Sequence, residues 1–442
     1  MSKPGNQGSQ LTPMQELRKK LWFVLGALIV FRIGTYIPVP GVDASVLAST
    51  FAENTGSALN FWNTFSGGAL QRASIFALGI TPYISASIVV QLLSTFLPSL
   101  VELKKEGEIG RRKISKITRY FTLILAALQS VVISTALPSY AEGLVPDYGL
   151  SFVISASISL TVGSLFLMWL GEQITERGIG NGISLIVFAG IVSGLPGAIM
   201  GTLEQARTES ISLLTLFAIA AITLIIIYAV VFVERSQRRI VIQYAQRNHM
   251  FGSRQQQSAP SYIPFKVNMA GVVPAIFASS IIAFITTFVT SLGAKFDTFN
   301  TLGNMLYPGQ PLQMVLLAAL IIFFAFFYTA LQYNPKDTAE QLKKSGAFIP
   351  GNRPGEQTAK LLDRIMTRVT LLGGLYLAIV ALSPEFMRFF YSYNSSFGGT
   401  SILIVVVVVM DFIGQVQSQM MSNKFGKILK ESNLDKYRSN WR

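Results

Sequence analysis

The sequence predicts an all-α polytopic membrane protein with ten transmembrane helices in two inverted five-helix halves. Hydrophobic residues make up 51% of the 442 residues and charged residues only 13%, whereas soluble domains carry about 25% charged residues. Apolar runs of about twenty residues, the length that crosses a bilayer, recur along the chain. Lysine and arginine are also distributed unevenly between the loops, which orients these runs in the membrane.

The hydrophobic runs define ten predicted spans. Because ten is even, both termini are expected on the same side of the membrane. The spans are Leu21–Ile37, Ile75–Leu97, Ile117–Leu137, Phe152–Leu170, Ile183–Met200, Ile211–Val233, Val267–Leu292, Leu312–Leu331, Val369–Phe390 and Thr400–Met421.

Basic residues gather on one side of this topology. With the N-terminus placed in the cytosol, 31 of the 36 lysines and arginines fall in cytosolic segments. Four lie on the opposite side and Arg32 lies inside the first span. This asymmetry is the orientation signal of membrane proteins. Much of the net charge of +14 therefore reflects topology and attraction to anionic lipid headgroups.

Ten spans divide into two groups of five, and an odd number in each group gives the two halves opposite orientations, as in inverted repeats. The expected organisation is a cytosolic tail (1–20), an N-terminal half (21–205), a C-terminal half (206–421) and a second cytosolic tail (422–442).

The stretch from Asn60 to Leu97 is the centre of the predicted organisation. Its second half is apolar enough to span, whereas its first half is half polar and contains Gly67-Gly68. The pattern predicts a short helix leading into a spanning helix, with Gly79 and Pro82 allowing a bend. Irregular backbone at membrane depth is tolerated only inside protein or beside water. The segment is therefore either a re-entrant packing element or a movable stopper in an aqueous path.

Two cytosolic loops, 234–266 and 334–368, are too long to be simple connectors. The first contains two β-prone runs and is expected to form an extended hairpin. The second predicts a short helix that Asn334 caps and that stops at Gly346, followed by a turn around Arg353 and a helix from Glu356. Such basic loops serve as topology determinants and contact lipid, but Arg353 between two Pro/Gly turns favours contact with a partner.

The sequence contains no motif typical of a catalytic site. The chain has no cysteine and one histidine, His249 in a polar loop, so we expect neither a metal site nor a cofactor. Charge inside the spans is limited to Arg32 and Asp411, which gives an ion-coupled mechanism little to work with. We therefore expect no enzyme activity, and we expect a partner to supply any energy that is needed.

Seven long segments carry a resemblance to the SecY family, the channel-forming subunits of bacterial Sec protein translocases. They are FRIGTYIPVPGVD (31–43), FSGGALQRASIFALGITPYISASI (65–88), KKEGEIGRRKISKITRY (104–120), MWLGEQITERGIGNGIS (168–184), VNMAGVVPAIFASSII (267–282), KKSGAFIPGNRPGEQTAK (343–360) and FGGTSILIVVVVVMDF (397–412).

The resemblance implies an hourglass-shaped central pore between the two halves, closed by a plug and able to open sideways into lipid. The implied plug lies at about 60–74 and includes Asn63, Phe65, Ser66, Gly67, Gly68, Leu70 and Arg72. The implied pore ring consists of Ile80, Ile84, Ile183, Val187, Ile276 and Ile404. The implied lateral gate is lined by Ser85, Gln91, Gln129, Asn268, Ser280 and Phe284.

The resemblance also implies partners and a location. The partners are the small membrane subunits SecE and SecG, the SecA motor ATPase, the ribosome with its nascent chain, signal sequences and anionic lipids, with ribosomal RNA reachable from the basic loops. The implied docking residues are Arg238, Arg239, Arg247, Arg254, Lys343, Lys344 and Arg353. The implied location is the bacterial inner membrane, with both termini in the cytosol. The activity is movement of unfolded secretory polypeptides across that membrane and sideways release of transmembrane segments.

Three other functions fit a protein with inverted halves. A transporter of small solutes predicts convergent polar groups at the midplane, and an ion channel predicts a ring of charges or carbonyls. A structural scaffold predicts a dry, tightly packed centre. An aliphatic waist favours the polypeptide channel, because it offers a passing chain no hydrogen bonds and excludes water by dewetting.

Overall fold

The structure is a computed structural model that describes residues 13–44, 46–47, 63, 65–139, 143–208, 212–244, 261–293, 303, 305–306, 309–391 and 398–431. Each predicted span falls on a helix. These helices are α1 (Pro13–Gly34), α4 (Thr81–Phe96), α6 (Glu108–Ala136), α7 (Leu150–Arg177), α8 (Gly182–Arg207), α9 (Leu213–Arg235), α10 (Val273–Gly293), α12 (Pro311–Gln332), α14 (Glu356–Tyr391) and α15 (Gly399–Glu431).

Among the described residues, seven helices are by themselves long and apolar enough to cross a membrane. An eighth span results if α4 and the following helix α5 (Pro98–Lys105), which are bent by 95°, are counted as one. Two helices that carry predicted spans are not among these candidates. The 22 residues of α1 include five charged side chains, and the apolar segment found in α10, Val273–Ile282, is short for a span. The mostly helical, polytopic class is thus confirmed, and the count of ten spans stays a prediction.

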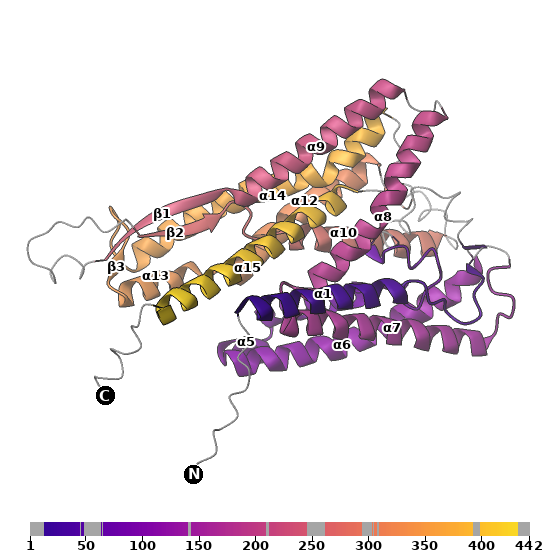
Figure 1. Ribbon diagram of the computed structural model, residues 1–442, viewed down its shortest axis with the longest axis horizontal. Coiled ribbons are helices and arrows are strands. Elements are labelled where there is room, and N and C mark those ends of the chain that lie inside the picture. The colour runs from indigo at the N-terminus through magenta and orange to yellow at the C-terminus, as the bar shows by residue number, and fades with distance from the viewer. Residues whose placement is uncertain are drawn as a thin grey trace, which may run out of the picture.

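The helices contact one another in two groups. The first contains α1, α4, α6, α7 and α8, and the second contains α9, α10, α12, α14 and α15. Contacts between the groups join α8 to α15 and α9, α4 to α10, and α1 to α15. In Figure 1 the indigo and purple helices of the first group lie below the orange and yellow helices of the second. The six residues of the implied pore ring, called the waist from here on, come from the helices at this junction.

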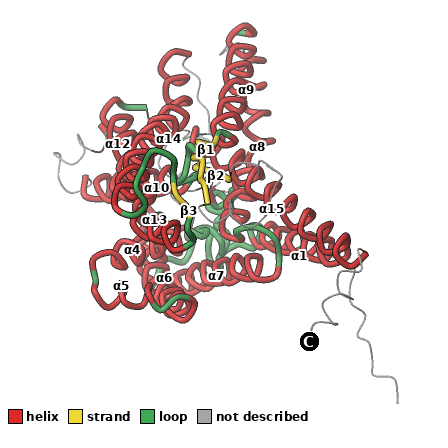
Figure 2. Tube along the Cα trace, turned by 90° about the vertical axis from the view of Figure 1, so that its left-hand side faces the viewer, coloured by secondary structure: helices red, strands yellow, loops and turns green. Residues whose placement is uncertain are grey.

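The two long loops, 234–266 and 334–368, contain a small sheet in addition to the helices. Strands β1 (Gln237–Tyr244) and β2 (Ser261–Lys266) form the predicted antiparallel hairpin, which confirms that expectation. The second loop forms helix α13 (Pro335–Lys344), whose N-cap Asn334 accepts a hydrogen bond from the Lys336 amide, as predicted. It then adds a short strand β3 (Ala347–Phe348), which pairs with β1 and was not predicted. Figure 2 shows the three strands at one end of the helices.

The sheet is fixed to α14 by its own small core of Ile240, Phe265, Ile349, Leu362 and Met366. Ile240 and Ile242 on β1 are buried while their neighbour Val241 is exposed, the alternation of a strand with one covered face. A rigid unit of sheet and α14 therefore projects beyond the spans.

The start of span two was predicted wrongly. Helix α4 begins at Thr81, not at Ile75. Residues 63 and 65 are helical, in line with the expected short helix, but residues 66–80 form turns with one isolated bridge at Ser74. Gly67, Gly68 and Gly79 have φ of 71°, 79° and 58°, and Ala73 has φ of 47°. These left-handed conformations interrupt a helix. The predicted bend at Gly79 and Pro82 is present, since Gly79 ends the turns and Pro82 lies in the first turn of α4.

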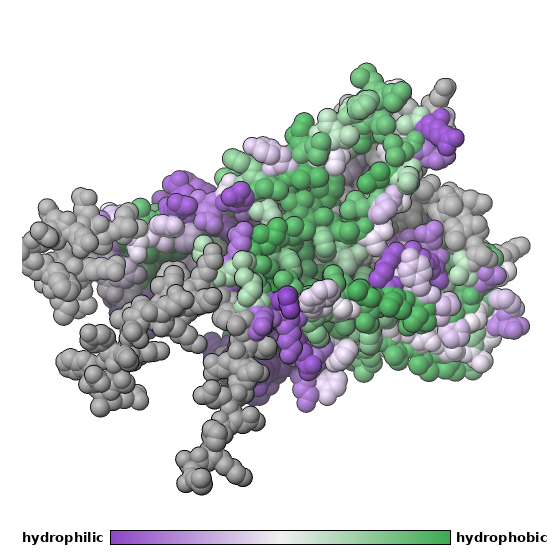
Figure 3. All heavy atoms as spheres, viewed as in Figure 1, coloured by the Kyte–Doolittle hydropathy of each residue, from purple (hydrophilic) through white to green (hydrophobic). Residues whose placement is uncertain are grey.

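The outer surface separates into apolar and polar zones. Figure 3 shows hydrophobic residues over the middle of the molecule and hydrophilic residues at the end that carries the sheet. On α9 the exposed apolar side chains include Leu214, Phe217, Leu224 and Tyr228. Such a belt matches the hydrocarbon region of a bilayer.

Candidate functional site

The six residues expected at the waist meet in one hydrophobic core cluster. Ile80, Ile84, Val187 and Ile404 are buried in it, and Ile183 and Ile276 are partly buried against it. They come from α8, α10, α15 and the start of α4, and so from both helix groups. Aliphatic side chains from both helix groups therefore belong to one continuous core.

A cavity of about 270 Å³ opens on the side of the waist that faces the sheet. Val187, Ile276 and Ile404 line it together with Val407 and Val408. Polar side chains also line it, among them Glu234, Lys266, Asn268, Asp411 and Gln415. Asp411 lies seven residues after Ile404, which places it about 10 Å further along the same face of α15. The cavity thus has both an aliphatic and a polar lining.

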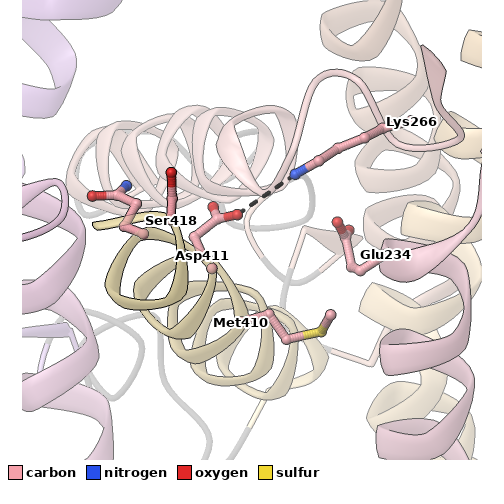
Figure 4. A pocket seen from close by; sticks show the side chains of 7 residues that line it. Glu234, Lys266, Met410, Asp411 and Ser418 are labelled. Carbon is pink, nitrogen blue, oxygen red and sulfur yellow. Dashed lines mark ion pairs between the residues drawn. The ribbon is translucent and has the colours of Figure 1, made fainter. Parts of the chain in front are cut away.

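Four of the polar residues, Glu234, Lys266, Asp411 and Gln415, also line a second cavity of about 280 Å³ beside α15. Figure 4 shows Lys266 reaching across it to Asp411, with Nζ and Oδ1 3.7 Å apart. Glu234 is buried, and the Asn268 amide donates to its Oε1 at 2.5 Å and to the Gly271 carbonyl at 3.1 Å. These contacts connect the ends of α9 and β2 with α10 and α15.

The expected plug lies directly against the waist. Phe65, Ala69 and Phe76 belong to the same core cluster as Ile80 and Val187. At Gly67 an added Cβ would lie 3.1 Å from the Gly190 Cα of α8, and at Gly190 an added Cβ would lie 2.7 Å from the Phe65 carbonyl oxygen. Backbone therefore contacts backbone here without side chains between.

Side-chain hydrogen bonds replace helix bonds inside the plug. The Gln71 amide donates to Asn63 Oδ1 at 2.9 Å, and the Leu70 amide donates to Ser66 Oγ at 3.3 Å. Ser66 Oγ donates in turn to the Asn63 carbonyl at 3.1 Å. Asn and Ser commonly satisfy nearby backbone groups in this way, in competition with helix formation. This explains why the polar half of the segment folds into turns.

The residues expected at the lateral gate are divided between two places. Helices α4 and α10 contact each other, and they carry the half-buried Ser85 and Gln91 and the buried Ser280. Gln129 lies half-buried on α6, which packs on α4. Asn268 lines the cavity instead, with its amide on Glu234. The backbone of Phe284 belongs to α10, and its side chain lies outside the description.

The expected docking residues that the structure describes are exposed and lie on the sheet, on α13 and in the turn that follows it. Arg238 and Arg239 project from β1, with the Arg239 guanidinium 4.9 Å from the Tyr262 ring. Lys343 and Lys344 end α13, and the carbonyl of exposed Arg353 accepts a hydrogen bond from Thr358 at 2.9 Å. Pairing of β1 with β3 brings the two loops together. Arg247 and Arg254 lie outside the described residues.

Comparison with known proteins decides the family. The SecY family profile matches residues 74–413. The protein translocase subunit SecY of Haemophilus influenzae is 58% identical over 421 residues, which cover 95% of each chain. The chain belongs to the SecY family. It is therefore a translocation-channel subunit and not an enzyme, as the sequence predicted.

Solved structures of the SecY and Sec61 channels share the fold. A SecY protein whose plug domain stabilises the closed state of its translocation channel aligns with a TM-score of 0.67 at 18% identity, over 96% of each chain. Sec61 in a canine ribosome–channel complex from the endoplasmic reticulum aligns with a TM-score of 0.64 at 17% identity, over 96% of this chain and 95% of that one.

Several residues at the SecY-family site were missed by sequence reasoning. Gly190 was overlooked because a glycine inside a spanning helix is ordinary in membrane packing. Glu234 and Lys266 were read as the ends of a loop, although Glu234 is buried, and Gln415 was not singled out within the predicted span Thr400–Met421. The position of Glu234 directly after an apolar span, beside a β-prone loop, was the available signal.

We expect Gly190→Ala to displace the plug. The new methyl group would lie 2.7 Å from the Phe65 carbonyl oxygen, which no real Cβ contact tolerates. Overpacking typically costs about 1–3 kcal/mol, so the ratio of closed to open channels should fall roughly tenfold to a hundredfold. Ion conductance of the resting translocase in planar bilayers measures this. The control is Gly197→Ala on the same helix, where an added Cβ would have no neighbouring atom within 4 Å. Equal conductance of the two variants would contradict the contact between Gly190 and the plug.

Proposed function

We propose that the six aliphatic residues form the permeability barrier of a channel that moves unfolded secretory polypeptides across the bacterial inner membrane. The observation that carries this is the continuity of cavity, waist and plug: Val187, Ile276 and Ile404 line the cavity, and Val187 and Ile404 share a core cluster with Phe65 and Ala69 of the plug. The two helix groups are the two halves of the channel, which divide near residue 205.

The aliphatic waist favours this function over a solute transporter or an ion channel. Carboxylates and amides lie in the cavity mouth, whereas the waist residues carry only hydrocarbon. Ion selectivity needs charges or carbonyls at the narrowest point. A polypeptide needs a barrier that yields to many side chains without binding any of them.

The seam between α4 and α10 is the proposed lateral gate. Ser85 and Gln91 on one helix and Ser280 on the other make it partly polar. A hydrogen bond across such a seam contributes only about 0.6 kcal/mol on average. An apolar signal helix can therefore replace these contacts, while a polar segment is kept from the lipid because its unsatisfied groups would cost several kcal/mol.

The exposed basic surface on the sheet, α13 and the Arg353 turn is the proposed docking site for the SecA motor and for the ribosome with its nascent chain. Support comes from its exposure, from the rigid core beneath it and from the ribosome-bound state of the related Sec61 channel. SecE and SecG would cover part of the apolar belt, and anionic lipids would contact basic residues at its cytosolic edge.

Replacing Ile404 with Asn should make the resting channel leak. An amide without a partner costs about 1–3 kcal/mol in an apolar site, so the variant favours a hydrated waist, and defective signal sequences should pass more readily. Conductance and export of a signal-sequence mutant measure the two effects. Val409→Asn on the same helix, outside the cavity lining, is the control. Normal conductance and normal signal selectivity in Ile404→Asn would remove Ile404 from the barrier.

Arg353→Glu should abolish motor-driven export without affecting membrane levels. Exposed substitutions usually change stability by within about 0.5 kcal/mol, whereas the charge reversal repels an acidic partner surface. Export by SecA-driven vesicles and immunoblots of membranes are the measurements, with exposed Arg364→Glu on α14 as the control. Loss of the Arg353→Glu chain from the membrane would show a structural role instead.

A disulfide between Ser85→Cys and Phe284→Cys should lock the gate. The bond forms if the two Cα atoms lie within about 7 Å in the closed channel. Export and membrane insertion should stop under oxidation and return on reduction, with each single cysteine variant as control. Unimpaired export with the disulfide fully formed would place the exit elsewhere.

A further inference from the structure

The outer end of α1 contacts the turn of the plug through Arg32. Arg32 Nη1 donates to the Gly67 carbonyl at 3.0 Å, and Nη2 donates to the Tyr36 hydroxyl at 3.0 Å. Two other donors reach the same carbonyl at greater distances, Ser193 at 3.4 Å and Arg72 at 3.5 Å. Because N–H···O bonds are best near 2.9–3.0 Å and weaken as they lengthen, Arg32 provides the principal contact.

Tyr36 provides a second connection between α1 and the plug. The Arg72 guanidinium carbon lies 4.3 Å from the centre of the Tyr36 ring, and that of Arg32 lies 5.0 Å from it. Both distances are within the range of cation–π attraction. Arg32 thus contacts Gly67, and Tyr36, two residues beyond the end of α1, contacts Arg72.

Neither guanidinium group has a carboxylate partner among the residues that the structure describes. Burial lowers the pKa of Arg72, Tyr36 opposes that shift and the nearby Arg32 adds to it. Arginine nevertheless stays charged. The contact is therefore a set of hydrogen bonds and ring contacts between like charges, which is easier to break than a buried ion pair.

The other end of the plug is fixed by backbone. The Val39 amide donates to the Ala73 carbonyl at 2.7 Å, and the Ile75 amide donates to the Ile37 carbonyl at 3.0 Å. Ser74 Oγ adds a hydrogen bond to the Gly34 carbonyl at 2.8 Å. The two ends of the plug thus differ: side chains fasten the Gly67 end, and a backbone bridge fastens the end at 73–75.

We propose that Arg32 is a plug-positioning residue that, with Tyr36 and Arg72, clamps the Gly67 end of the plug, and that residues 73–75 are the hinge about which the released plug turns. The inference rests on the proposed role of residues 63–74 as the plug. It adds a role for Arg32 that the pore ring and the gate do not require.

The test measures accessibility at each end of the plug in the full translocase. The chain has no cysteine, so Ser66→Cys reports on the clamped end and Ser74→Cys on the hinge; both serines are buried. A membrane-impermeant maleimide is added to the outer side. Arg32→Met should speed labelling at position 66 about tenfold, the loss expected for one hydrogen bond to a charged group. Labelling at position 74 should not change.

Two further variants control for charge and for fold. Arg32→Lys keeps the charge, but its single ammonium cannot reproduce the planar fork, so it should give a smaller increase at position 66. Arg207→Met removes an outer-side arginine from α8, about 21 Å along the helix from Ser193, and should change nothing.

Unchanged labelling at position 66 in Arg32→Met overturns the clamp, and equal acceleration at 66 and 74 overturns the hinge. If Arg32→Met does not reach the membrane, Arg32→Lys is measured in its place, and absence of both shows a folding role and also overturns the proposal. Ile404→Asn distinguishes failure of the clamp from failure of the proposed barrier. If Ile404→Asn leaks ions while Arg32→Met leaves labelling at position 66 unchanged, only the clamp is rejected. If Ile404→Asn does not leak, the proposed barrier is rejected.

Discussion

The close contact between the backbones of Gly67 and Gly190 is the constraint on which the proposed closure of the channel by the plug depends. It brings an irregular segment of chain against a spanning helix with no side chain between, so Phe65 and Ala69 reach the core that contains Ile80, Val187 and Ile404. Irregular backbone at this depth requires internal hydrogen bonds, and Asn63 and Ser66 supply them. Any side chain larger than that of glycine at position 190 of α8 would push the plug away from the waist.

The end of the helices that carries the sheet shows the opposite design. Here a cavity of about 270 Å³ remains open, lined by aliphatic residues and by the polar side chains of Glu234, Asn268 and Asp411. The ion pair of Lys266 with Asp411 joins the end of the docking sheet to the helix that carries Ile404. In the proposed channel, a polypeptide would therefore pass from this polar cavity to the aliphatic waist, and the change in solvation would be concentrated at the waist.

Hydropathy was enough to locate the helices, because the cost of placing polar groups in lipid fixes where apolar runs must lie; the orientation that the basic residues indicate stays a prediction. The family resemblance located Ile80, Val187 and Ile404, which the fold brings together. The start of α4 at Thr81 was missed, because Ile75 to Ile80 are mostly apolar and yet form turns. Strand β3 was missed because two residues carry no periodic pattern. Asn268 was assigned to the gate, since sequence alone did not reveal its partner Glu234.

The central claim is that a translocating polypeptide crosses the aliphatic waist. The most direct measurement places a photo-crosslinking amino acid at Ile80 or at Ile276, with Leu224 on the exposed face of α9 as the control, and traps a secretory chain midway through export. The account predicts crosslinks to the trapped chain from Ile80 and Ile276 and none from Leu224. A chain trapped across the membrane that crosslinks to neither waist position would contradict it.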